Sequence, residues 1–152
     1  MATTGETKTA AKTPRLTLRC STCRKWNRVR ADRAANGPKC GECGTALALD
    51  HPVALDDETF DRVIGETEVP VLVDFYADWC GPCKMMAPAV STLARESVGR
   101  ALVAKLDTDH ATRIASQHQI RGIPTSIVFR NGREVKRQTG TVPLATLRAM
   151  LA

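Results

Sequence analysis

The fold of this chain is decided by one stretch, Ala77-Asp78-Trp79-Cys80-Gly81-Pro82-Cys83-Lys84. It follows an apolar, β-branched run, residues 69–76, which predicts a buried strand. A helix that begins at the motif would hold Cys80 at its N-terminus and Cys83 one turn further on. The partial positive charge of a helix N-terminus favours the thiolate, which is the reactive form of cysteine. The spacing therefore indicates a cysteine pair that makes and breaks a disulfide.

The other four cysteines form two further C-x-x-C pairs: Cys20, Cys23, Cys40 and Cys43. Their spacing, C-x2-C-x16-C-x2-C, falls within the range of four-cysteine zinc sites, which are closed and tetrahedral. Gly41 and Gly44 stand where we expect tight turns with positive φ. Residues 16–49 hold few large apolar side chains, so bound metal would supply folding free energy on the order of 10 kcal/mol. We predict one structural zinc ion. Iron in the same ligand set and a second redox dithiol are the alternatives.

The basic charge lies in the first third of the chain. Residues 1–50 hold ten Lys and Arg against four Asp and Glu, and residues 51–152 hold twelve of each, so the whole excess of +6 is N-terminal. Arginines around Trp26 could contact phosphates and stack a base. Four thiolates around Zn²⁺ leave a net negative charge that these cations offset, and Trp26 can serve as the small core of a hairpin. We therefore expect no nucleic-acid binding.

Composition changes near Asp50, which predicts a flexible tail at residues 1–15, a zinc ribbon at 16–50 and a second domain at 51–152. The first fifteen residues contain no apolar stretch of the kind found in signal peptides, and no run is long enough to cross a membrane. Paired cysteines in a reducing compartment are metal ligands or catalysts more often than structural disulfides. We expect a monomeric, cytoplasmic protein without membrane contact.

From Val53 onward, strand and helix patterns alternate. Acidic residues at 56–58 precede a predicted helix, and the pattern then predicts a strand at 71–77, a helix at 81–97 kinked by Pro88, a strand at 101–106 and a helix at 111–118. Two further strands, 125–129 and 134–139, flank Asn131-Gly132, a strong hairpin signal. Pro143 can open a last helix with its leucines on one face. The predicted order is β-α-β-α-β-α-β-β-α.

This order resembles the thioredoxin fold, an α/β fold in which helices flank a mixed central sheet. The matching residues are Val73-Asp74-Phe75, the Cys80–Cys83 motif, Lys105, Arg121-Gly122-Ile123-Pro124-Thr125 and Gly140. A four-cysteine ribbon ahead of such a domain is similar to the zinc-ribbon thioredoxin-2 type of bacteria. Tyr76 departs from the family, because many thioredoxins have tryptophan there.

The resemblance implies a protein-disulfide reductase that binds no organic cofactor and is recharged by thioredoxin reductase, an NADPH-dependent flavoprotein. Cys80, expected to be the exposed thiolate, attacks a disulfide of a substrate protein, and Cys83 then releases the reduced substrate. Two other functions remain open. One is a zinc-ribbon interaction module whose thioredoxin domain is a docking scaffold. The other is a disulfide isomerase, which would need a less reducing dithiol.

Asp74 and Lys105 are the predicted partners of the cysteines. Asp74 alternates with Val73 and Phe75, so it can point into the core beneath Cys83. A buried carboxylate has a raised pKa and could accept the proton of Cys83. Lys105 lies on the neighbouring predicted strand and is expected to pair with Asp74. An ordinary surface lysine is the alternative for Lys105.

The resemblance also implies a substrate-binding rim around Cys80. In the family the bond corresponding to Ile123–Pro124 is cis, and the backbone of Ile123 would pair with an extended substrate segment. The expected rim and motif residues are Trp79, Gly81, Pro82, Ile123, Pro124, Gly140 and Thr141.

Overall fold

A small antiparallel hairpin begins the described part of the chain. The computed structural model describes residues 12–152, so most of the predicted tail lies outside the described residues. The strands of the hairpin pair from Arg15↔Arg30 to Arg19↔Trp26, and a short 3-10 helix, η1 (Ala31–Arg33), follows. The strands are β1 (Arg15–Arg19) and β2 (Trp26–Arg30). An isolated bridge, Lys39↔Ala46, encloses the second pair of ribbon cysteines.

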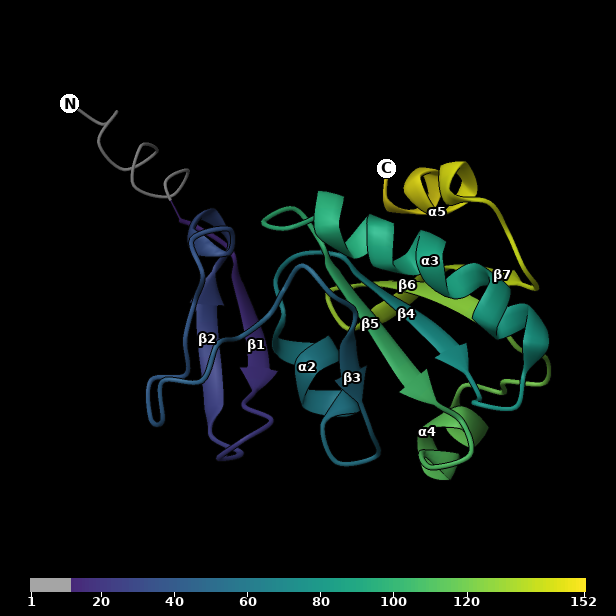
Figure 1. Cartoon of the computed structure of the whole chain (residues 1–152), viewed down its shortest axis with the longest axis horizontal. Coiled ribbons are helices and arrows are strands. Elements are labelled where there is room, and N and C mark those ends of the chain that lie inside the picture. Colours follow the sequence, from purple (N-terminus) through teal and green to yellow (C-terminus); the bar gives the residue numbers. More distant parts are fainter. Residues whose placement is uncertain (1–11) are drawn as a thin grey trace.

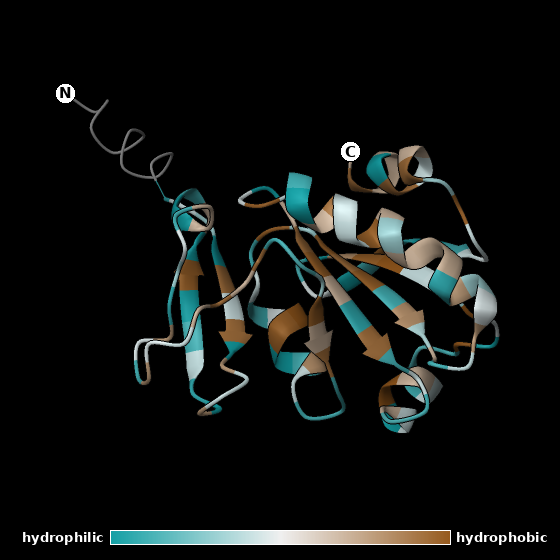
Figure 2. Cartoon of the chain, in the orientation of Figure 1, coloured by the Kyte–Doolittle hydropathy of each residue, from teal (hydrophilic) through white to brown (hydrophobic). Residues whose placement is uncertain are grey.

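A five-stranded mixed sheet forms the centre of the molecule, in the order β3-β5-β4-β6-β7 (Figure 1). The first three strands in this order run parallel to one another. Strand β6 runs antiparallel to both of its neighbours, β4 and β7. The strands are β3 (Val53–Leu55), β4 (Val71–Tyr76), β5 (Leu102–Asp107), β6 (Thr125–Arg130) and β7 (Arg133–Thr139). This is the mixed sheet that the resemblance to the thioredoxin fold implies. Figure 2 shows hydrophobic residues concentrated in its central strands.

Helices cover both faces of the sheet, and the side chains of β4 point alternately to one face and the other. Leu72 packs with residues of α3 and α5 on one face, whereas Val71, Val73 and Phe75 join a second cluster with residues of α2 and α4 on the other. Asp74 shares the face of Leu72, since alternate residues of a strand point the same way. The helices are α2 (Phe60–Glu66), α3 (Gly81–Glu96), α4 (Thr112–Gln117) and α5 (Leu144–Leu151).

Local sequence signals account for several element boundaries. Asn131 and Gly132 both have positive φ, 54° and 79°, as a two-residue hairpin turn requires, so the predicted β6–β7 hairpin is confirmed. The long helix runs as one element through Pro88. Pro143 is the N-cap of α5, and Leu147 is fully buried on the face that packs against α3.

The ribbon is joined to the rest of the chain by a shared hydrophobic cluster and by hydrogen bonds. Leu16 and Leu18 of β1 belong to the same cluster as Phe60 and Val63 of α2. The backbone N–H of Arg15 donates to Glu68 Oε1 (2.9 Å), and the carbonyl of Arg15 accepts from the backbone N–H of Glu68 (2.8 Å). Ribbon residues thus belong to the hydrophobic core on the side of the sheet that α2 covers.

The ribbon also touches the loop after α3. A Cβ atom added to Gly99, whose φ is +85°, would lie 3.0 Å from the carbonyl oxygen of Ala31. Cys80 begins the same helix at its other end, so the ribbon and the cysteine motif lie at opposite ends of α3 (Figure 1). Within residues 12–152, no helix combines the length and hydrophobicity needed to cross a membrane.

Candidate functional site

The cysteine motif occupies the N-terminal turn of α3. Cys80 is the N-cap residue in an extended conformation, and its Sγ accepts a hydrogen bond from the backbone N–H of Cys83 (3.2 Å). Gly81 and Pro82 form the first positions of the helix, where proline loses no helical hydrogen bond. Cys80 and Cys83 are joined by a disulfide, with Cα atoms 5.3 Å apart. The structure therefore represents the oxidised form of the pair.

Neither cysteine is exposed in this form. Cys80 is 3% and Cys83 is 4% exposed in the disulfide, whereas the prediction of an exposed Cys80 concerns the thiolate of the reduced protein. Tyr76 and Ile123 pack against the cluster that the cysteines form with Ala77, and the carbonyl oxygen of Ile123 lies 3.8 Å from Cys80 Sγ. The backbone of Ile123 therefore borders Cys80.

Asp74 lies beneath Cys83 in a nearly closed environment. It is 5% exposed, and its Oδ1 has no hydrogen-bond partner among the described residues. Burial raises the pKa of Asp74 to about 7, and the positive charge of Lys105 opposes this shift. A hollow of about 160 Å³ is lined by Asp74, Cys83 and Lys105, among others. The structure thus brings the predicted acid and the second cysteine to one small cavity.

Lys105 is the register partner of Asp74 on the neighbouring strand β5. Its ammonium group lies over the ring of Tyr76, 5.6 Å from the ring centre. No ion pair between Lys105 and Asp74 occurs among the described residues, so the expected direct pairing is absent. Lys105 acts on the carboxyl group only through its charge.

Trp79 stands beside the disulfide as a large exposed side chain. It is 70% exposed, and its indole Nε1–H donates to Asp109 Oδ2 (2.8 Å). Asp109 follows the end of β5 and holds the indole in place. Sequence reasoning missed Asp109, because no spacing pattern connects it with the cysteine motif thirty residues earlier.

The remaining rim residues are held together by backbone contacts. The Ile123–Pro124 bond is cis, as the resemblance implies. The N–H of Gly140, which has a φ of +94°, donates to the carbonyl of Pro124 (2.7 Å). The hydroxyl of Thr141 donates to the carbonyl of Pro82 (3.4 Å). These bonds connect the loop after β7 with the start of α3 and with the cis bond.

The four ribbon cysteines meet at one point. Their Sγ atoms all lie within 4.8 Å of one another, and the pairs Cys20–Cys43 and Cys23–Cys40 are 3.6 Å apart. A tetrahedral zinc with Zn–S bonds of about 2.3 Å requires sulfur–sulfur distances of about 3.8 Å. The observed distances fit this requirement. Sequence-distant hairpins thus supply a complete four-sulfur ligand set.

Backbone geometry shapes the two cysteine turns in the same way. The residue after the second cysteine of each pair has positive φ, 67° at Arg24 and 77° at Gly44. Gly41 does not have positive φ, so that part of the prediction is wrong. Its N–H instead donates to Asn27 Oδ1 (2.9 Å), and Asn27 Nδ2 donates to Cys40 Sγ (3.5 Å). Asn27 therefore orients one ligand from outside the cysteine turns.

Several basic residues of the ribbon face acidic side chains of residues 51–152. Arg24 pairs with Glu58 (2.7 Å), and Arg28 lies 3.6 Å from Glu66. Trp26 is half-buried, and the guanidinium group of Arg62 lies over its ring, 4.4 Å from the ring centre. The cations near Trp26 thus contribute to an internal interface.

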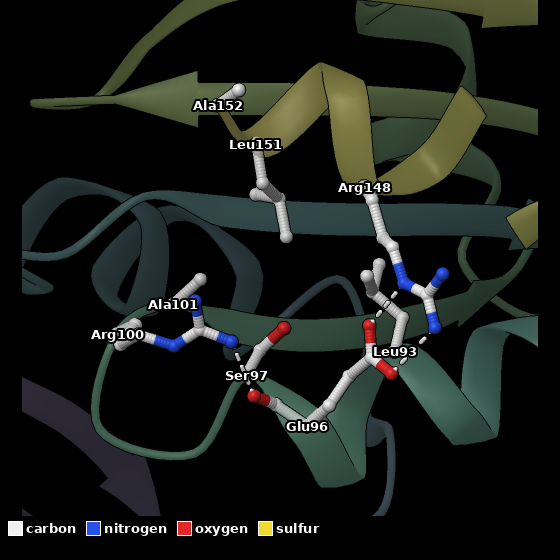
Figure 3. Close-up of a pocket in the computed structure, with 8 residues that line it drawn as sticks. All are labelled: Leu93, Glu96, Ser97, Arg100, Ala101, Arg148, Leu151 and Ala152. Carbon is white, nitrogen blue, oxygen red and sulfur yellow. Dashed lines mark hydrogen bonds and ion pairs between the residues drawn. The ribbon is translucent and has the colours of Figure 1, made fainter. Parts of the chain in front are cut away.

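A second hollow, of about 270 Å³, lies between α3 and α5 (Figure 3). Arg148 donates two hydrogen bonds to the carboxylate of Glu96 (2.6 and 2.9 Å). Arg100 donates to the carbonyl of the same glutamate. Both arginines are thus engaged within the protein, and Arg148 fastens α5 to the C-terminal end of α3.

Comparison with known proteins agrees with both parts of the chain. A family model described as Thioredoxin matches residues 51–152, and one described as Thioredoxin 2, N-terminal matches residues 19–45. Thioredoxin C-3 of Corynebacterium nephridii is 36% identical over 132 residues, covering 87% of this chain and 90% of its own. Thioredoxin 1 of Nostoc is 46% identical over 91 residues, covering 60% of this chain and 85% of its own.

Two further similarities extend the comparison. A chloroplastic M-type thioredoxin of Spinacia oleracea is 44% identical over 105 residues, which are 69% of this chain. This chain spans 58% of the spinach protein's length. The solved structure of a mutant thioredoxin from Halobacterium salinarum superposes with a TM-score of 0.62 at 38% identity, covering 69% of this chain and 91% of that one.

The fold and the disulfide at the start of α3 define a thiol-disulfide oxidoreductase, with the role of a protein-disulfide reductase. The chain belongs to the thioredoxin family and carries the N-terminal zinc-ribbon domain of the thioredoxin-2 type.

Proposed function

We propose that this protein reduces disulfides of cytoplasmic proteins through the Cys80/Cys83 dithiol and is recharged by thioredoxin reductase. The observation that carries the proposal is the disulfide at the N-cap of α3, with the buried Asp74 in the same hollow as Cys83. Disulfide exchange needs a reactive thiolate, a second thiol within reach and an acceptor for the second proton. Once the disulfide is reduced, this arrangement would supply all three.

The reaction runs in two exchange steps. The thiolate of Cys80 attacks one sulfur of a substrate disulfide, so a mixed disulfide forms and the other substrate sulfur leaves as a thiolate. Cys83 then loses its proton and attacks Cys80 Sγ. The Cys80–Cys83 bond forms, and the second substrate sulfur leaves. Two electrons pass from the dithiol to the substrate, and the reductase returns them at the expense of NADPH.

Surrounding residues bind substrate and accept the proton. With a pKa of about 7, Asp74 is partly ionised near neutral pH and can take the proton of Cys83, while Lys105 favours the ionised form. Trp79, Gly140 and Thr141 form the rim on which an extended segment would lie. The backbone of Ile123 would pair with that segment by strand addition.

The ribbon cysteines hold one structural zinc ion in this proposal. Cys20, Cys23, Cys40 and Cys43 would bind it, and the closed four-sulfur set leaves no position for a substrate. The metal supplies folding free energy to a segment that has few apolar side chains of its own.

Trapping of mixed disulfides tests the order of attack. Cys83→Ser is expected to accumulate mixed disulfides with substrate proteins, because Cys80 can attack but nothing resolves the bond. Cys80→Ser is expected to trap almost none. The measurement is non-reducing electrophoresis with mass spectrometry, and the double variant controls for non-covalent capture. Trapping by Cys80→Ser alone, or equal trapping by both, would reverse or remove the assigned roles.

The redox potential of the pair separates the proposed reductase from an isomerase. Equilibration with a series of thiol buffers is expected to give a potential near the strongly reducing value of about −270 mV typical of thioredoxin. A potential near about −180 mV, as in protein disulfide isomerase, would favour isomerase activity instead.

A further inference from the structure

A row of polar side chains crosses the sheet beneath the cysteine pair. Asp74 of β4 is the register partner of Lys105 on β5 and of Ser126 on β6. Residues directly opposite one another in neighbouring strands share a face of the sheet. The next row on the same face, formed by Leu72, Val103 and Val128, is entirely hydrophobic and packs against α3 and α5. The polar row is therefore a local departure from an apolar face.

Two atoms of this row are buried without a partner. Among residues 12–152, only Asp74 Oδ1 and Ser126 Oγ are buried side-chain oxygens that make no hydrogen bond. Ser126 is fully buried and Asp74 is 5% exposed. A buried polar group without a hydrogen bond costs stability, so such atoms are rare in folded proteins. Here the two coincide at directly opposed positions of neighbouring strands.

The strand register places these two groups side by side, although no hydrogen bond joins them in the structure. Cβ atoms of directly opposed residues in an antiparallel pair lie about 4.5–5.5 Å apart. The serine side chain rotates between staggered χ1 positions, and its hydroxyl provides one donor. An ionised carboxylate is an acceptor only, so the hydroxyl matches it when the proton has left.

We propose that Ser126 is a positioning residue for disulfide exchange, whose hydroxyl donates to Asp74 Oδ1 when that carboxyl group is ionised. The inference rests on the proposed role of Asp74 as proton acceptor for Cys83. The hydroxyl stabilises the negative charge from the β6 side, and Lys105 stabilises it from the β5 side. Ser126 thereby sets the pH at which Asp74 accepts a proton.

Several titratable and charged residues line the same hollow as Asp74. Lys84 comes from α3 with Cys83, Lys105 comes from β5, and Tyr76 and Asp78 come from β4 and the loop after it. Ser126 does not line this hollow, and it lies opposite Asp74 on the neighbouring strand β6. From β6, a neutral donor is thus the group that faces the carboxyl.

The test measures the protonation of Asp74 itself. The carboxyl carbon of Asp74 is titrated by NMR in the full chain, with Asp74→Asn to assign the resonance. Ser126→Ala is expected to raise the pKa of Asp74 by about one unit, because a donor to the charged form is lost. Ser126→Thr keeps a hydroxyl and should restore the original pKa. Val128→Ala, one row away on the same buried face, should leave it unchanged.

Each other outcome overturns the inference. An unchanged pKa in Ser126→Ala would show that the hydroxyl does not donate to the carboxylate. A lowered pKa would show that it accepts from the protonated carboxyl instead. An equal rise in Val128→Ala would mark a general packing effect.

The proposed function has a separate readout. The rate at which the mixed disulfide is resolved, followed against pH, should shift to higher pH in Ser126→Ala. A rate that is unaffected by Asp74→Asn would remove the role of Asp74 in catalysis. The NMR titration would still decide whether Ser126 donates to Asp74.

Discussion

At the scale of single residues, burial decides the chemistry of this site. Asp74 and Asp109 both lie close to the cysteine pair, but they differ in exposure. Asp109 is exposed and binds the indole of Trp79. Asp74 is 5% exposed, and desolvation raises the pKa of its carboxyl group to about 7. One aspartate thus serves as an anchor for a rim side chain, and the other can exchange a proton near neutral pH.

Replacing Asp74 should stabilise the protein in a pH-dependent way. The folded pKa, about 7, lies above the ordinary value of 3.8, so the folded state binds more protons between these values. The contribution of Asp74 to the free energy of unfolding therefore falls as pH rises from about 4 to 7 and stays low above 7. The difference between the two pKa values corresponds to roughly 4 kcal/mol. Asp74→Asn should recover a few kcal/mol above pH 7, as measured by denaturant unfolding.

The increase in the free energy of unfolding caused by Asp74→Asn should become smaller as the pH is lowered toward 4. Asp50→Asn, which alters an exposed carboxylate, is a control for general charge effects. A stability difference between Asp74→Asn and the natural protein that is constant from pH 4 to 8 would contradict a raised pKa.

Sequence reasoning found some of these residues and not others. The inward position of Asp74 follows from its alternation with Val73 and Phe75, which the structure places on the opposite face. Asp109 and Ser126 escaped prediction for a physical reason. Their partners lie on other strands or loops, and strand register and loop position are not visible in local spacing.

At the scale of elements, the sequence predicts most clearly those boundaries that are marked by turn or capping residues. The Asn131-Gly132 turn and the helix start at Cys80 are determined by a few adjacent residues, and the structure has both. The cysteine turns of the ribbon were predicted less well. Arg24 takes the same positive φ as Gly44, which shows that the turn imposes this conformation on whichever residue follows the second cysteine.

The ribbon should carry one zinc ion per chain. Metal analysis of the reduced protein is expected to give close to one equivalent, because the four sulfur atoms have the spacing of a tetrahedral site. A thiol reagent should then react rapidly with two cysteines, Cys80 and Cys83, and with all six after unfolding in a chelator. Iron in place of zinc, or a metal-free protein with six rapidly reacting thiols, would contradict a structural zinc site.

At the scale of the whole molecule, the ribbon and residues 51–152 share one interface. The charge excess and the composition indicated two parts, but not that Arg24, Arg28 and Trp26 face the second part. A cation that pairs across an interface looks the same in sequence as one that faces solvent. The shared cluster could not be predicted either, since it depends on how β1 lies against α2.

The contact at Gly99 offers a direct test of this interface. A left-handed conformation costs an alanine roughly 1–2 kcal/mol, and Gly99→Ala should lower the free energy of unfolding by more than this amount. The added Cβ would also press on the carbonyl of Ala31 at 3.0 Å. Gly132→Ala is the matched control, because its φ is +79° and its nearest added contact is 3.7 Å. Denaturant unfolding of both variants gives the comparison.

An equal loss in the two variants would show that the ribbon yields freely at this contact. A larger loss in Gly99→Ala would show that the ribbon resists displacement from the loop after α3.

The separation of the ribbon from Cys80 along α3 also makes the molecule an electric dipole. Residues 1–50 carry the whole formal excess of +6, which a zinc ion bound by four thiolates would reduce but not cancel, whereas residues 51–152, which hold the cysteine pair at the opposite end of α3, are formally neutral. A charged protein approaching through solution therefore exerts a torque before any contact is made. A positively charged partner would meet the end that bears Cys80, and a negatively charged one would be drawn to the ribbon. Salt weakens this orientation, since charges more than about 8 Å apart are largely screened at physiological ionic strength.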